Sequence, residues 1–408
     1  MLKLSGYKIM IITLVTLFSC SRINPGHTQG NRNADLQFVN ENALKSGAAN
    51  TELYFHLLKN KNIGVVCNHS SLIFGRHLVD ILVSEGFQVK TIFSPEHGFR
   101  GNAEAGAEIG HGIDQKTGIR VVSLYGKNKK PLPADLDQID ILLFDIQDVG
   151  VRFYTYISTL TLVMEAAAEQ GIPLIVLDRP NPNGFYVDGP LLDTAYRSFV
   201  GMHPVPVVYG MTIGEYARMI NGEDWLNGLR CDLEVIPVEG YHHHMIVELN
   251  VSPSPNLPDW ESIYLYPSVC FFEGTFISVG RGTDQPFQVI GHPACLVGSN
   301  SFTPRSIPGV SDHPPYEGQL CLGSNLTSYA ENYIENPRQI NLSWLIGMQE
   351  FFKDSTHFFN PYFDKLAGTA QLKIDILDKK TEAEIRQSWE ADLLRFRQIR
   401  SKYLIYPE

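Results

Sequence analysis

The sequence predicts an α/β fold with a doubly wound, mainly parallel sheet, followed by a smaller α+β domain. Short runs of apolar and β-branched residues recur from residue 63, and they have the length of buried strands. These runs lie at 63–67, 89–93, 120–124, 141–144, 174–177 and 205–209. Segments with helical periodicity lie between them, and such alternation favours a parallel sheet. Right-handed crossovers then bring the loops that follow the strands to one edge, as in Rossmann-like folds.

Four segments carry helix signals. Apolar residues at 78, 79, 82 and 83 share one helical face, and a second helix over 160–170 ends at Gly171. Thr212 and Glu215 form a capping-box pattern that opens a helix through residue 219. A terminal helix over 382–402 has an apolar face made of Ile385, Trp389, Leu393, Phe396 and Ile399. We expect this last helix to pack on the smaller domain.

The composition is that of a globular protein. The chain has 408 residues, of which 44% are hydrophobic and 19% are charged, so that it can bury a large core or two domains. Its formal net charge is −11, and the sequence has no basic stripe. Proteins that bind nucleic acids need such a stripe, so we expect no nucleic-acid partner. We assign residues 46–235 to a Rossmann-like domain and 236–408 to a smaller second domain.

The first residues have the pattern of an export signal. Lys3 and Lys8 precede an apolar stretch, 9–18, that is too short to span a bilayer. The stretch ends in Leu17-Phe18-Ser19-Cys20, which is similar to the bacterial lipobox, whose cysteine is diacylated. The alternative is a plain secretory signal with a coincidental cysteine. We expect a signal peptide over 1–19, lipidation at Cys20, a flexible tether over 20–45, and a membrane-anchored lipoprotein that faces the periplasm.

Several signatures of cofactor and metal sites do not occur in the sequence. It contains no Gly-x-Ser-x-Gly elbow, no Walker loop and no His-Glu-x-x-His, and Gly110-His111-Gly112 lacks the third glycine of the dinucleotide fingerprint. Three consecutive histidines, 242–244, point in divergent directions and suit a solvated turn better than a metal ion. Apart from Cys20, five scattered cysteines suit buried thiols. We therefore expect neither a metal nor a cofactor.

Polar groups gather in the loops after the predicted strands, which is the edge where open α/β sheets bind ligands. They include Asn68, His69, Glu96, His97, Asp145, Asp148, Arg152, Tyr154, Tyr156 and Asn181. Glycosidases use paired carboxylates, and the candidates here are Glu96, Asp145, Asp148 and Glu273. Tyrosine rings such as Tyr154 and Tyr156 can stack on a sugar. The alternatives are loop charges that only face water and an internal ion pair of Arg281 with Asp284 or Glu273.

Long motifs in the chain resemble those of a known family. They are Phe93-Ser-Pro-Glu-His-Gly-Phe-Arg-Gly101, Phe144-Asp-Ile-Gln-Asp-Val-Gly150, Arg152-Phe-Tyr-Thr-Tyr156, Asp178-Arg-Pro-Asn-Pro-Asn-Gly184, Ser254-Pro-Asn-Leu-Pro258 and Gly280-Arg-Gly-Thr-Asp284. Together they resemble the exo-β-N-acetylmuramidase family, formerly a family of unknown function. The resemblance implies an enzyme that removes terminal β-1,4-linked N-acetylmuramic acid from the non-reducing end of peptidoglycan fragments. It also implies a Rossmann-like N-terminal domain, a smaller C-terminal domain and a site between them.

The resemblance also suggests roles for single residues. By its place in the Ser-Pro-Glu-His motif, Glu96 resembles the family's candidate catalytic acid, with Asp145 or Asp148 as a neighbouring carboxylate that would raise its pKa. A second group would act at the anomeric carbon by direct attack, by activating water or by polarising the substrate's 2-acetamido group. One of Arg100, Arg152 and Arg281 could bind the lactyl carboxylate. The substrate-binding candidates are Asn68, His69, His97, Arg100, Arg152, Tyr154, Asn181, Glu273, Arg281 and Asp284.

Two rival functions stay open at this point. A lipoprotein that binds cell-wall sugars would keep the crevice without catalysis. An amidase or esterase would use Asp145 and His97 instead of a glycosidic acid. Release of free N-acetylmuramic acid separates the muramidase from both rivals.

Overall fold

The computed structural model describes residues 37–96, 98–100, 112–331, 338–353, 355 and 357–408. Within these ranges seven strands form one sheet, in the order β10-β9-β8-β2-β5-β7-β6. Their bounds are β2 Asn62–Cys67, β5 Gln88–Ser94, β6 Gly112–Ile113, β7 Arg120–Ser123, β8 Ile141–Asp145, β9 Leu174–Leu177 and β10 Leu233–Ile236. Only β6 is antiparallel to its neighbour. The other strands, counted along the chain, have the spatial order 3-2-1-4-5-6 of a Rossmann fold, which confirms the predicted class.

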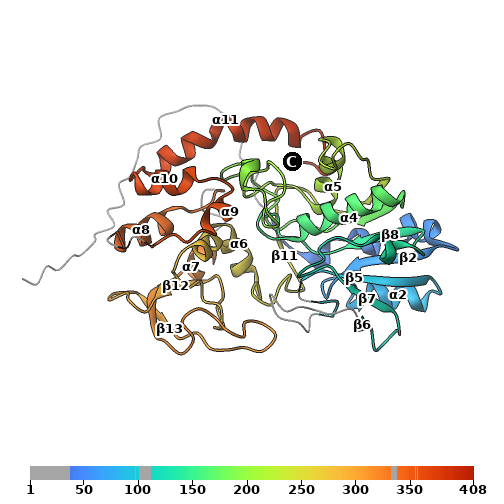
Figure 1. Cartoon of the computed structure of the whole chain (residues 1–408), viewed down its shortest axis with the longest axis horizontal. Coiled ribbons are helices and arrows are strands. Elements are labelled where there is room, and N and C mark those ends of the chain that lie inside the picture. Colours follow the sequence, from blue (N-terminus) through green and yellow to red (C-terminus); the bar gives the residue numbers. More distant parts are fainter. Residues whose placement is uncertain (1–36, 97, 101–111, 332–337, 354, 356) are drawn as a thin grey trace, which may run out of the picture. The chain divides into compact units, whose positions relative to one another are not determined.

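Helices cover both faces of this sheet. Successive residues of a strand point to opposite sides, so Val66 of β2 packs in the same cluster as Leu160 of α4 (Tyr156–Gln170). Val65 packs instead in a second cluster with Leu78 of α2 (Leu78–Ser84). Figure 1 shows α4 and α5 (Ile213–Gly222) on one side of the strands and α2 on the other. The sheet is therefore doubly wound.

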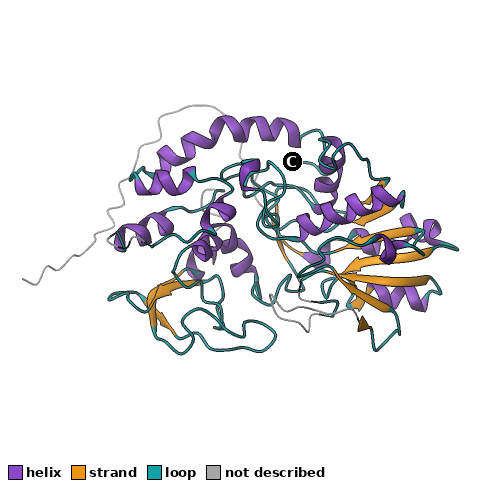
Figure 2. Cartoon of the chain, viewed as in Figure 1, coloured by secondary structure: helices purple, strands orange, loops and turns teal. Residues whose placement is uncertain are grey.

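The second half of the chain combines a small sheet with helices, as a smaller α+β domain does. In the described part of this half, β12 Val289–His292, β14 Cys321–Asn325 and β13 Asn300–Phe302 form an antiparallel sheet in that order (Figure 2). Two short pairings complete the strands: parallel β1 Gln37–Asn40 with β11 Met245–Glu248, and the hairpin β3 Leu72–Ile73 with β4 Arg76–His77. The remaining helices are α1 Thr51–Tyr54, α3 Pro133–Leu136, α6 Trp260–Val269, α7 Thr327–Glu331, α8 Ser343–Phe351, α9 Phe363–Ala367, α10 Gln371–Leu377 and α11 Glu382–Arg400.

The four predicted helices are confirmed. α4 ends at Gly171, whose φ of +65° lies in the left-handed region that glycine adopts without strain. At the start of α5, the Thr212 hydroxyl accepts from the Glu215 N–H, and the Glu215 carboxylate accepts from the Thr212 N–H. This reciprocal pair is the capping box that the sequence predicted.

The packing of α11 differs from the prediction. The helix does bury the apolar face of Ile385, Trp389, Leu393 and Phe396. However, Arg397 donates to the Val187 carbonyl at 2.9 Å and Arg400 donates to the Gly210 carbonyl at 2.7 Å, both in the segment between β9 and α5. The terminal helix therefore contacts the first half of the chain as well as the second.

The strand predicted over residues 205–209 is wrong. This run is fully buried, yet it forms no strand of the sheet, whose sixth parallel strand is β10. Val208 makes only isolated bridges, with Val151 and Asp188. Pro206 has no backbone N–H to donate, which prevents a regular ladder. An apolar run marks burial, and here the buried segment is a connection.

The fold begins earlier than predicted. Residues 37–45 were expected in a flexible tether, but Gln37–Asn40 form β1 and Lys45 bridges to Glu239. Cys20 and the rest of the expected signal and tether lie outside the described residues. The boundary between 235 and 236 stays a prediction. Residues Leu36–Glu408 make one compact unit, and its main apolar core includes residues of both halves.

Two other features bear on the sequence predictions. Five cysteines, Cys67, Cys231, Cys270, Cys295 and Cys321, are buried and free, as expected. Among the described residues, no helix combines the length and the apolar character needed to cross a membrane.

Candidate active site

A pocket of about 600 Å³ lies where the ends of β5 and β7 meet the second half of the chain. We call it the Glu96 pocket. Its ionisable and aromatic lining residues include Glu96, Tyr125, Lys129, Phe153, Tyr154, Tyr156, Phe199, Tyr266, Glu273, Arg281, Phe287, Tyr362 and Lys365. The structure thus brings together Glu96, Tyr154, Glu273 and Arg281 from the predicted set, and adds others.

Glu96 stands at the carboxyl end of β5. The strand ends at Ser94, and Gly98, with φ of +77°, turns the chain so that its N–H donates to the Pro95 carbonyl at 3.3 Å. Burial raises the pKa of Tyr125 to about 12, and the charge of Glu96 and a hydrogen bond with it add to that effect. Glu96 is thus held in direct contact with a tyrosine hydroxyl from the end of the neighbouring strand.

Two more tyrosines respond to the charge of Glu96. Burial raises the pKa of Tyr156, and the carboxylate of Glu96 raises it further. Burial also raises the pKa of Tyr362, with further contributions from Cys270, Glu273 and Glu96. Because both carboxylates act on Tyr362, Glu96 and Glu273 lie within electrostatic reach of the same ring.

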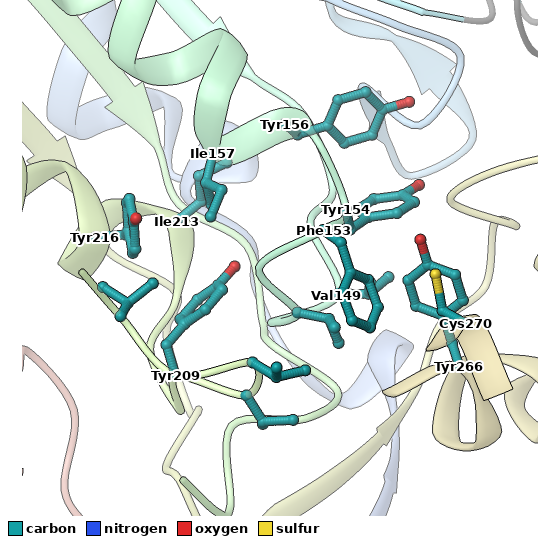
Figure 3. Packing of buried hydrophobic residues seen from close by; sticks show 14 of the residues in the cluster. Val149, Phe153, Tyr154, Tyr156, Ile157, Tyr209, Ile213, Tyr216, Tyr266 and Cys270 are labelled. Atoms are coloured by element: carbon teal, nitrogen blue, oxygen red, sulfur yellow. The ribbon is translucent and has the colours of Figure 1, made fainter. Parts of the chain in front are cut away.

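Tyr154, Tyr156 and Tyr266 form an aromatic wall of the pocket. Ring centroids lie 4.9 Å apart for Tyr154 with Tyr156 and 6.0 Å apart for Tyr154 with Tyr266, both edge to face. Figure 3 shows the three rings at one end of the buried cluster. The Tyr154 hydroxyl donates to the Pro253 carbonyl at 2.7 Å, and Asn68 Nδ2 donates to the Tyr156 hydroxyl at 2.9 Å. Fixed rings with polar tips suit a ligand that has apolar faces and hydroxyl edges, as a sugar does.

Glu273 and Arg281 form the second charged group of the pocket. Arg281 Nε donates to Glu273 Oε1 at 2.6 Å, and both side chains are about one quarter exposed. Burial alone lowers the pKa of Arg281, but the charge and hydrogen bond of Glu273 raise it overall. The internal ion pair considered from the sequence is therefore present with Glu273, and it lines the pocket.

The Gly-Arg-Gly motif has a local explanation. Gly280 and Gly282 both have φ of +77°, a region that strains other residues. A Cβ at Gly280 would lie 2.5 Å from Val289 Cγ2, and one at Gly282 would lie 2.4 Å from Pro314 Cγ. The two glycines let the loop turn tightly on either side of Arg281 and so present its guanidinium to Glu273.

Two lysines bring positive charge to the pocket. Lys129 Nζ donates to the Gly126 carbonyl at 3.0 Å and lies 5.0 Å from the centre of the Phe199 ring. Lys365 is exposed in the last turn of α9 and lines the same pocket. Neither lysine was among the predicted site residues.

Asp145 and Asp148 do not line the Glu96 pocket. Asp145 is fully buried in a bidentate ion pair with Arg179, whose Nε and Nη2 lie 2.6 and 3.0 Å from its two oxygens. Asp148 is 4% exposed and accepts from the Tyr209 hydroxyl and the Gly150 N–H. Burial raises the pKa of Asp148 to about 7, despite these hydrogen bonds. Both carboxylates are thus bound to buried partners outside the pocket. Glu273 is the second carboxylate that lines the pocket, beside Glu96.

Arg152 and Asn181 are buried parts of the scaffold. Arg152 is 0% exposed and donates to four backbone carbonyls, those of Pro190, Val205, Leu366 and Ala367. Asn181 donates to the Met211 carbonyl and accepts from the Asn183 N–H. Neither lines the Glu96 pocket. Asn68 is also 0% exposed, and it donates to the hydroxyl of Tyr156, which does line the pocket.

The other predicted site residues lie elsewhere. His69 bonds the Ser252 carbonyl at 2.8 Å, and Arg100 pairs with Asp114 and Asp80 at 2.8 and 3.1 Å. These two line a separate groove beside α2. Asp284 pairs with Arg305 at 2.7 Å on the surface. His97 lies outside the described residues.

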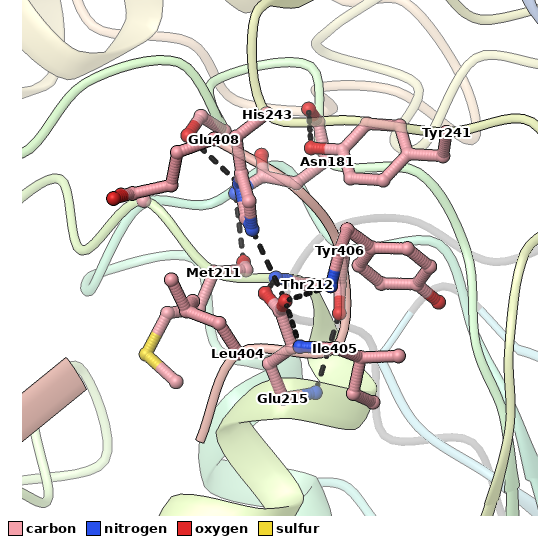
Figure 4. A network of polar contacts seen from close by, with 12 residues as sticks. Asn181, Met211, Thr212, Glu215, Tyr241, His243, Leu404, Ile405, Tyr406 and Glu408 are labelled. Atoms are coloured by element: carbon pink, nitrogen blue, oxygen red, sulfur yellow. Dashed lines mark hydrogen bonds and ion pairs between the residues drawn. The ribbon is translucent and has the colours of Figure 1, made fainter. Parts of the chain in front are cut away.

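The histidine run includes a turn, as predicted, but the turn is not fully solvated, because its middle histidine is buried. His243 is 2% exposed, with its ring nitrogens 3.1 Å from Gly184 O and from Glu215 Oε1. Figure 4 shows this network, in which Glu215 also accepts from the N–H groups of Ile405 and Tyr406. His243 therefore helps to hold the C-terminal segment. In the part of the chain that the structure describes, no cluster of His, Cys, Asp and Glu could hold a metal ion.

Sequence reasoning missed several lining residues, and one signal was available. Tyr125 and Lys129 follow the third predicted strand, 120–124, and the rule that selected the other strand ends applies to them equally. Tyr362 comes directly before the five-residue helix α9, and Lys365 lies within it, far along the chain. No local pattern marks them, because only the tertiary fold brings them to the sheet edge.

Comparison with protein families covers most of the chain. The model described as "Exo-beta-N-acetylmuramidase NamZ, N-terminal" matches residues 63–261, and the corresponding C-terminal model matches residues 264–406. The chain belongs to the exo-β-N-acetylmuramidase NamZ family. Glu96 and Tyr154 fall in the N-terminal NamZ match, while Glu273 and Arg281 fall in the C-terminal one. The Glu96 pocket is thus built from both parts of the NamZ fold.

Individual NamZ relatives agree with this assignment. The chain is 41% identical over 371 residues to the peptidoglycan beta-N-acetylmuramidase NamZ of Bacillus subtilis, covering 86% of this chain and 89% of that protein. A crystal structure of a DUF1343 family protein from Bacteroides fragilis has a TM-score of 0.83 and 46% identity, covering 90% of this chain and 99% of that one. A second such protein from the same organism has a TM-score of 0.74 and 27% identity, covering 89% and 99%.

Proposed function

We propose that this protein is an exo-acting glycoside hydrolase that releases terminal β-1,4-linked N-acetylmuramic acid from the non-reducing end of peptidoglycan fragments. One observation carries the proposal: in a member of the NamZ family, a single pocket joins Glu96, the Glu273–Arg281 pair and a wall of tyrosines. Carboxylates with aromatic rings are what a glycosidase needs to bind a pyranose and stabilise an oxocarbenium-like transition state.

In this proposal Glu96 is the general acid. It protonates the glycosidic oxygen as the bond to the anomeric carbon breaks, so that the sugar alcohol leaves neutral. The nearby hydroxyl of Tyr125, whose pKa is raised to about 12, stays protonated at neutral pH and can donate to Glu96. Glu273 is the second carboxylate of the pocket, and Arg281 fixes its orientation.

The lactyl carboxylate of muramic acid requires a cation. Arg100 and Arg152, which the sequence offered for this role, have other partners away from the pocket. We assign the role to Lys129 and Lys365, because both line the pocket and Arg281 is already paired with Glu273. A glucosamine substrate lacks this carboxylate and would gain nothing from the two lysines.

Mass spectrometry of digested muropeptides tests the proposed function. Purified protein is incubated with peptidoglycan fragments that carry muramic acid at the non-reducing end, with Glu96→Gln as the matched variant. We expect the native protein to release free N-acetylmuramic acid and the variant to release little. Binding without release would favour a non-catalytic sugar-binding protein, and release of peptides or acyl groups would favour an amidase or esterase.

We also propose that the protein is exported and anchored in a membrane through Cys20, facing the periplasm. The support is the short apolar stretch that ends in Leu17-Phe18-Ser19-Cys20. Cys20→Ala is expected to move the protein from the membrane fraction to the soluble fraction and to abolish labelling with a fatty-acid analogue. Cys295→Ala, which removes a buried thiol, serves as the control. Unchanged fractionation of Cys20→Ala would overturn the anchor.

A further inference from the structure

A second pocket, of about 320 Å³, shares no lining residue with the Glu96 pocket. We call it the switch-point pocket. Ser70 enters it after β2, Gln147 after β8 and Arg179 after β9. The order of the parallel strands reverses between β2 and β8, and α/β sheets bind ligands in the crevice at that point. Glu41 and Asn250 close the pocket from outside the sheet.

A buried acceptor in this pocket lacks a partner. Gln147 is 3% exposed, and its Nε2 donates to the carbonyls of Asp148 and Pro180, both at 2.7 Å. Carbonyls only accept, so the amide cannot flip, and Oε1 is left as an acceptor without a hydrogen-bond partner among the described residues. A buried unpaired acceptor costs ~1–3 kcal/mol, and the fold bears this cost directly behind the pocket wall that Gln147 forms.

An exposed aromatic ring stands at the rim of the same pocket. Phe74 is 84% exposed and occupies the tight turn between β3 and β4 with φ of +47°. Such turns favour Asn or Gly, and a bulky residue there is strained. Strain of this kind persists where a site requires the side chain. The ring therefore offers its face to a ligand at a cost to the backbone.

The charges of the pocket narrow the class of ligand. Arg179 is neutralised by Asp145, and its Nη1 lies 3.9 Å from Glu41 Oε1, which adds a negative charge. A phosphate would be repelled by Glu41, and no glycine-rich phosphate loop is present. The pocket instead offers the Glu41 carboxylate as an acceptor, with the aromatic face of Phe74 beside it. These features match a neutral pyranose, which has hydroxyl donors on its edge and C–H groups on its face.

A segment of chain joins the two pockets. Asn250 and Val251 line the switch-point pocket, while Ser254 and Asn256 line the Glu96 pocket. Even fully extended, residues 250–256 span at most ~22 Å, so the two pockets lie within reach of one oligosaccharide. His69 fixes this segment through the Ser252 carbonyl.

From these features we propose that the switch-point pocket is a second carbohydrate-binding site, which holds a pyranose of a glycan strand against Phe74. Glu41 accepts hydrogen bonds from its hydroxyls. The site is separate from the Glu96 pocket. It would retain a glycan near the reaction without taking part in bond cleavage.

Calorimetric titration with N,N′-diacetylchitobiose tests this site. We expect binding to the native protein and about tenfold weaker binding for Phe74→Asn, in line with the loss of a stacking contact. Asparagine tolerates the left-handed conformation, so the variant should unfold at no lower temperature than the native protein. Asn250→Ala, which removes another polar side chain from the lining of the pocket, should also weaken binding. Phe351→Ala, which removes another exposed phenylalanine, serves as the control and should bind like the native protein.

Two results would contradict the proposed second site. Equal binding by the native protein and Phe74→Asn, or no binding of the disaccharide by the native protein, overturns the second site. The readout is binding, so the two proposals can fail separately. If the protein is inactive but its sugar binding depends on Phe74, the proposed function is wrong and this site stands. If the protein is active but its sugar binding does not depend on Phe74, this site is wrong and the proposed function stands.

Discussion

At the scale of single residues, the fold fixes the two carboxylates of the Glu96 pocket in different ways. Glu273 is locked by Arg281 at 2.6 Å, so its charge is balanced and its orientation is set. Glu96 shares the pocket with tyrosine hydroxyls, and its charge and hydrogen bond help to raise the pKa of Tyr125. A carboxylate committed to an ion pair is less available for proton transfer, so Glu273 suits the step at the anomeric carbon and Glu96 suits the role of the acid.

This difference predicts how Glu96→Gln affects catalysis. A general acid contributes ~10²–10⁴-fold to rate, so kcat on peptidoglycan fragments should fall by about that factor. A nitrophenyl β-N-acetylmuramide should lose much less, because nitrophenolate leaves without protonation. Steady-state kinetics on both substrates measure the two losses, with Glu350→Gln, an exposed residue of α8, as the control.

Other outcomes would reassign Glu96. Equal losses on both substrates would implicate it in the step at the anomeric carbon. Full activity on both substrates would show that Glu96 is not the general acid. Glu273 would then be the next carboxylate to substitute.

Asp148 illustrates a carboxyl group whose burial has a cost. Burial raises its pKa to about 7 from the usual 3.8, so between those values the native state holds a proton that the unfolded state has lost. The stability from this group is fully present below pH 3.8 and is lost as the pH rises towards 7. Asp148→Asn keeps a neutral side chain, so its advantage over the native protein should grow by up to ~1.4 kcal/mol per pH unit across this window. Urea unfolding at several pH values measures the difference, and a constant difference would contradict the assignment.

Residue types at strand ends could be predicted from the sequence, but their roles could not. Glu96 and Tyr154 do line the pocket, while Arg152, from the same motifs, is fully buried and does not line it. Its acceptors include the Leu366 carbonyl, 214 residues away in the chain. A scaffold arginine and a substrate-binding arginine look alike until such distant partners are known.

At the scale of elements, the strands and helices with strong local signals were predictable. β2 and β8 have nearly continuous apolar runs because they are buried on both faces, and β5 is buried over its last four residues. β10 was missed because this edge strand has the pattern Leu-Glu-Val-Ile, with only Ile236 fully buried. The run at 205–209 was mistaken for a strand because full burial also selects apolar residues in a connection.

The capping boxes of α5 and α11 should differ in strength. At α5, the Thr212 hydroxyl also donates to buried Asp178 at 2.7 Å, whereas Thr381 caps α11 at the surface. Thr381→Ala should cost ~1 kcal/mol of unfolding free energy, as exposed caps do. Thr212→Ala should cost ~2–3 kcal/mol, because it also removes a hydrogen bond from a buried carboxyl group. Denaturant unfolding of both variants, with Thr→Ser at each site as controls, measures the difference, and equal losses would contradict it.

At the scale of the whole molecule, one apolar core unites the two halves of the chain. The cluster that contains Phe144 of β8 and Leu160 of α4 also contains Phe271, Phe363 and Trp389 from the second half. The C-terminal segment is tied back to α5 through Glu215, and α11 is tied to the segment after β9. The Glu96 pocket depends on this union, because its lining residues come from both halves.

The shared core predicts that the halves unfold together. A boundary at residue 235 would give two transitions if each side were stable alone, but separating the halves would expose apolar residues of a single cluster. The variant Trp225→Phe leaves tryptophans only at 260, 344 and 389, all in the second half. Its fluorescence should therefore give the same denaturation midpoint as its far-ultraviolet circular dichroism, which reports on the helices of both halves. Two separate midpoints would instead establish two independently stable domains and would make the cleft between them an interface that can open.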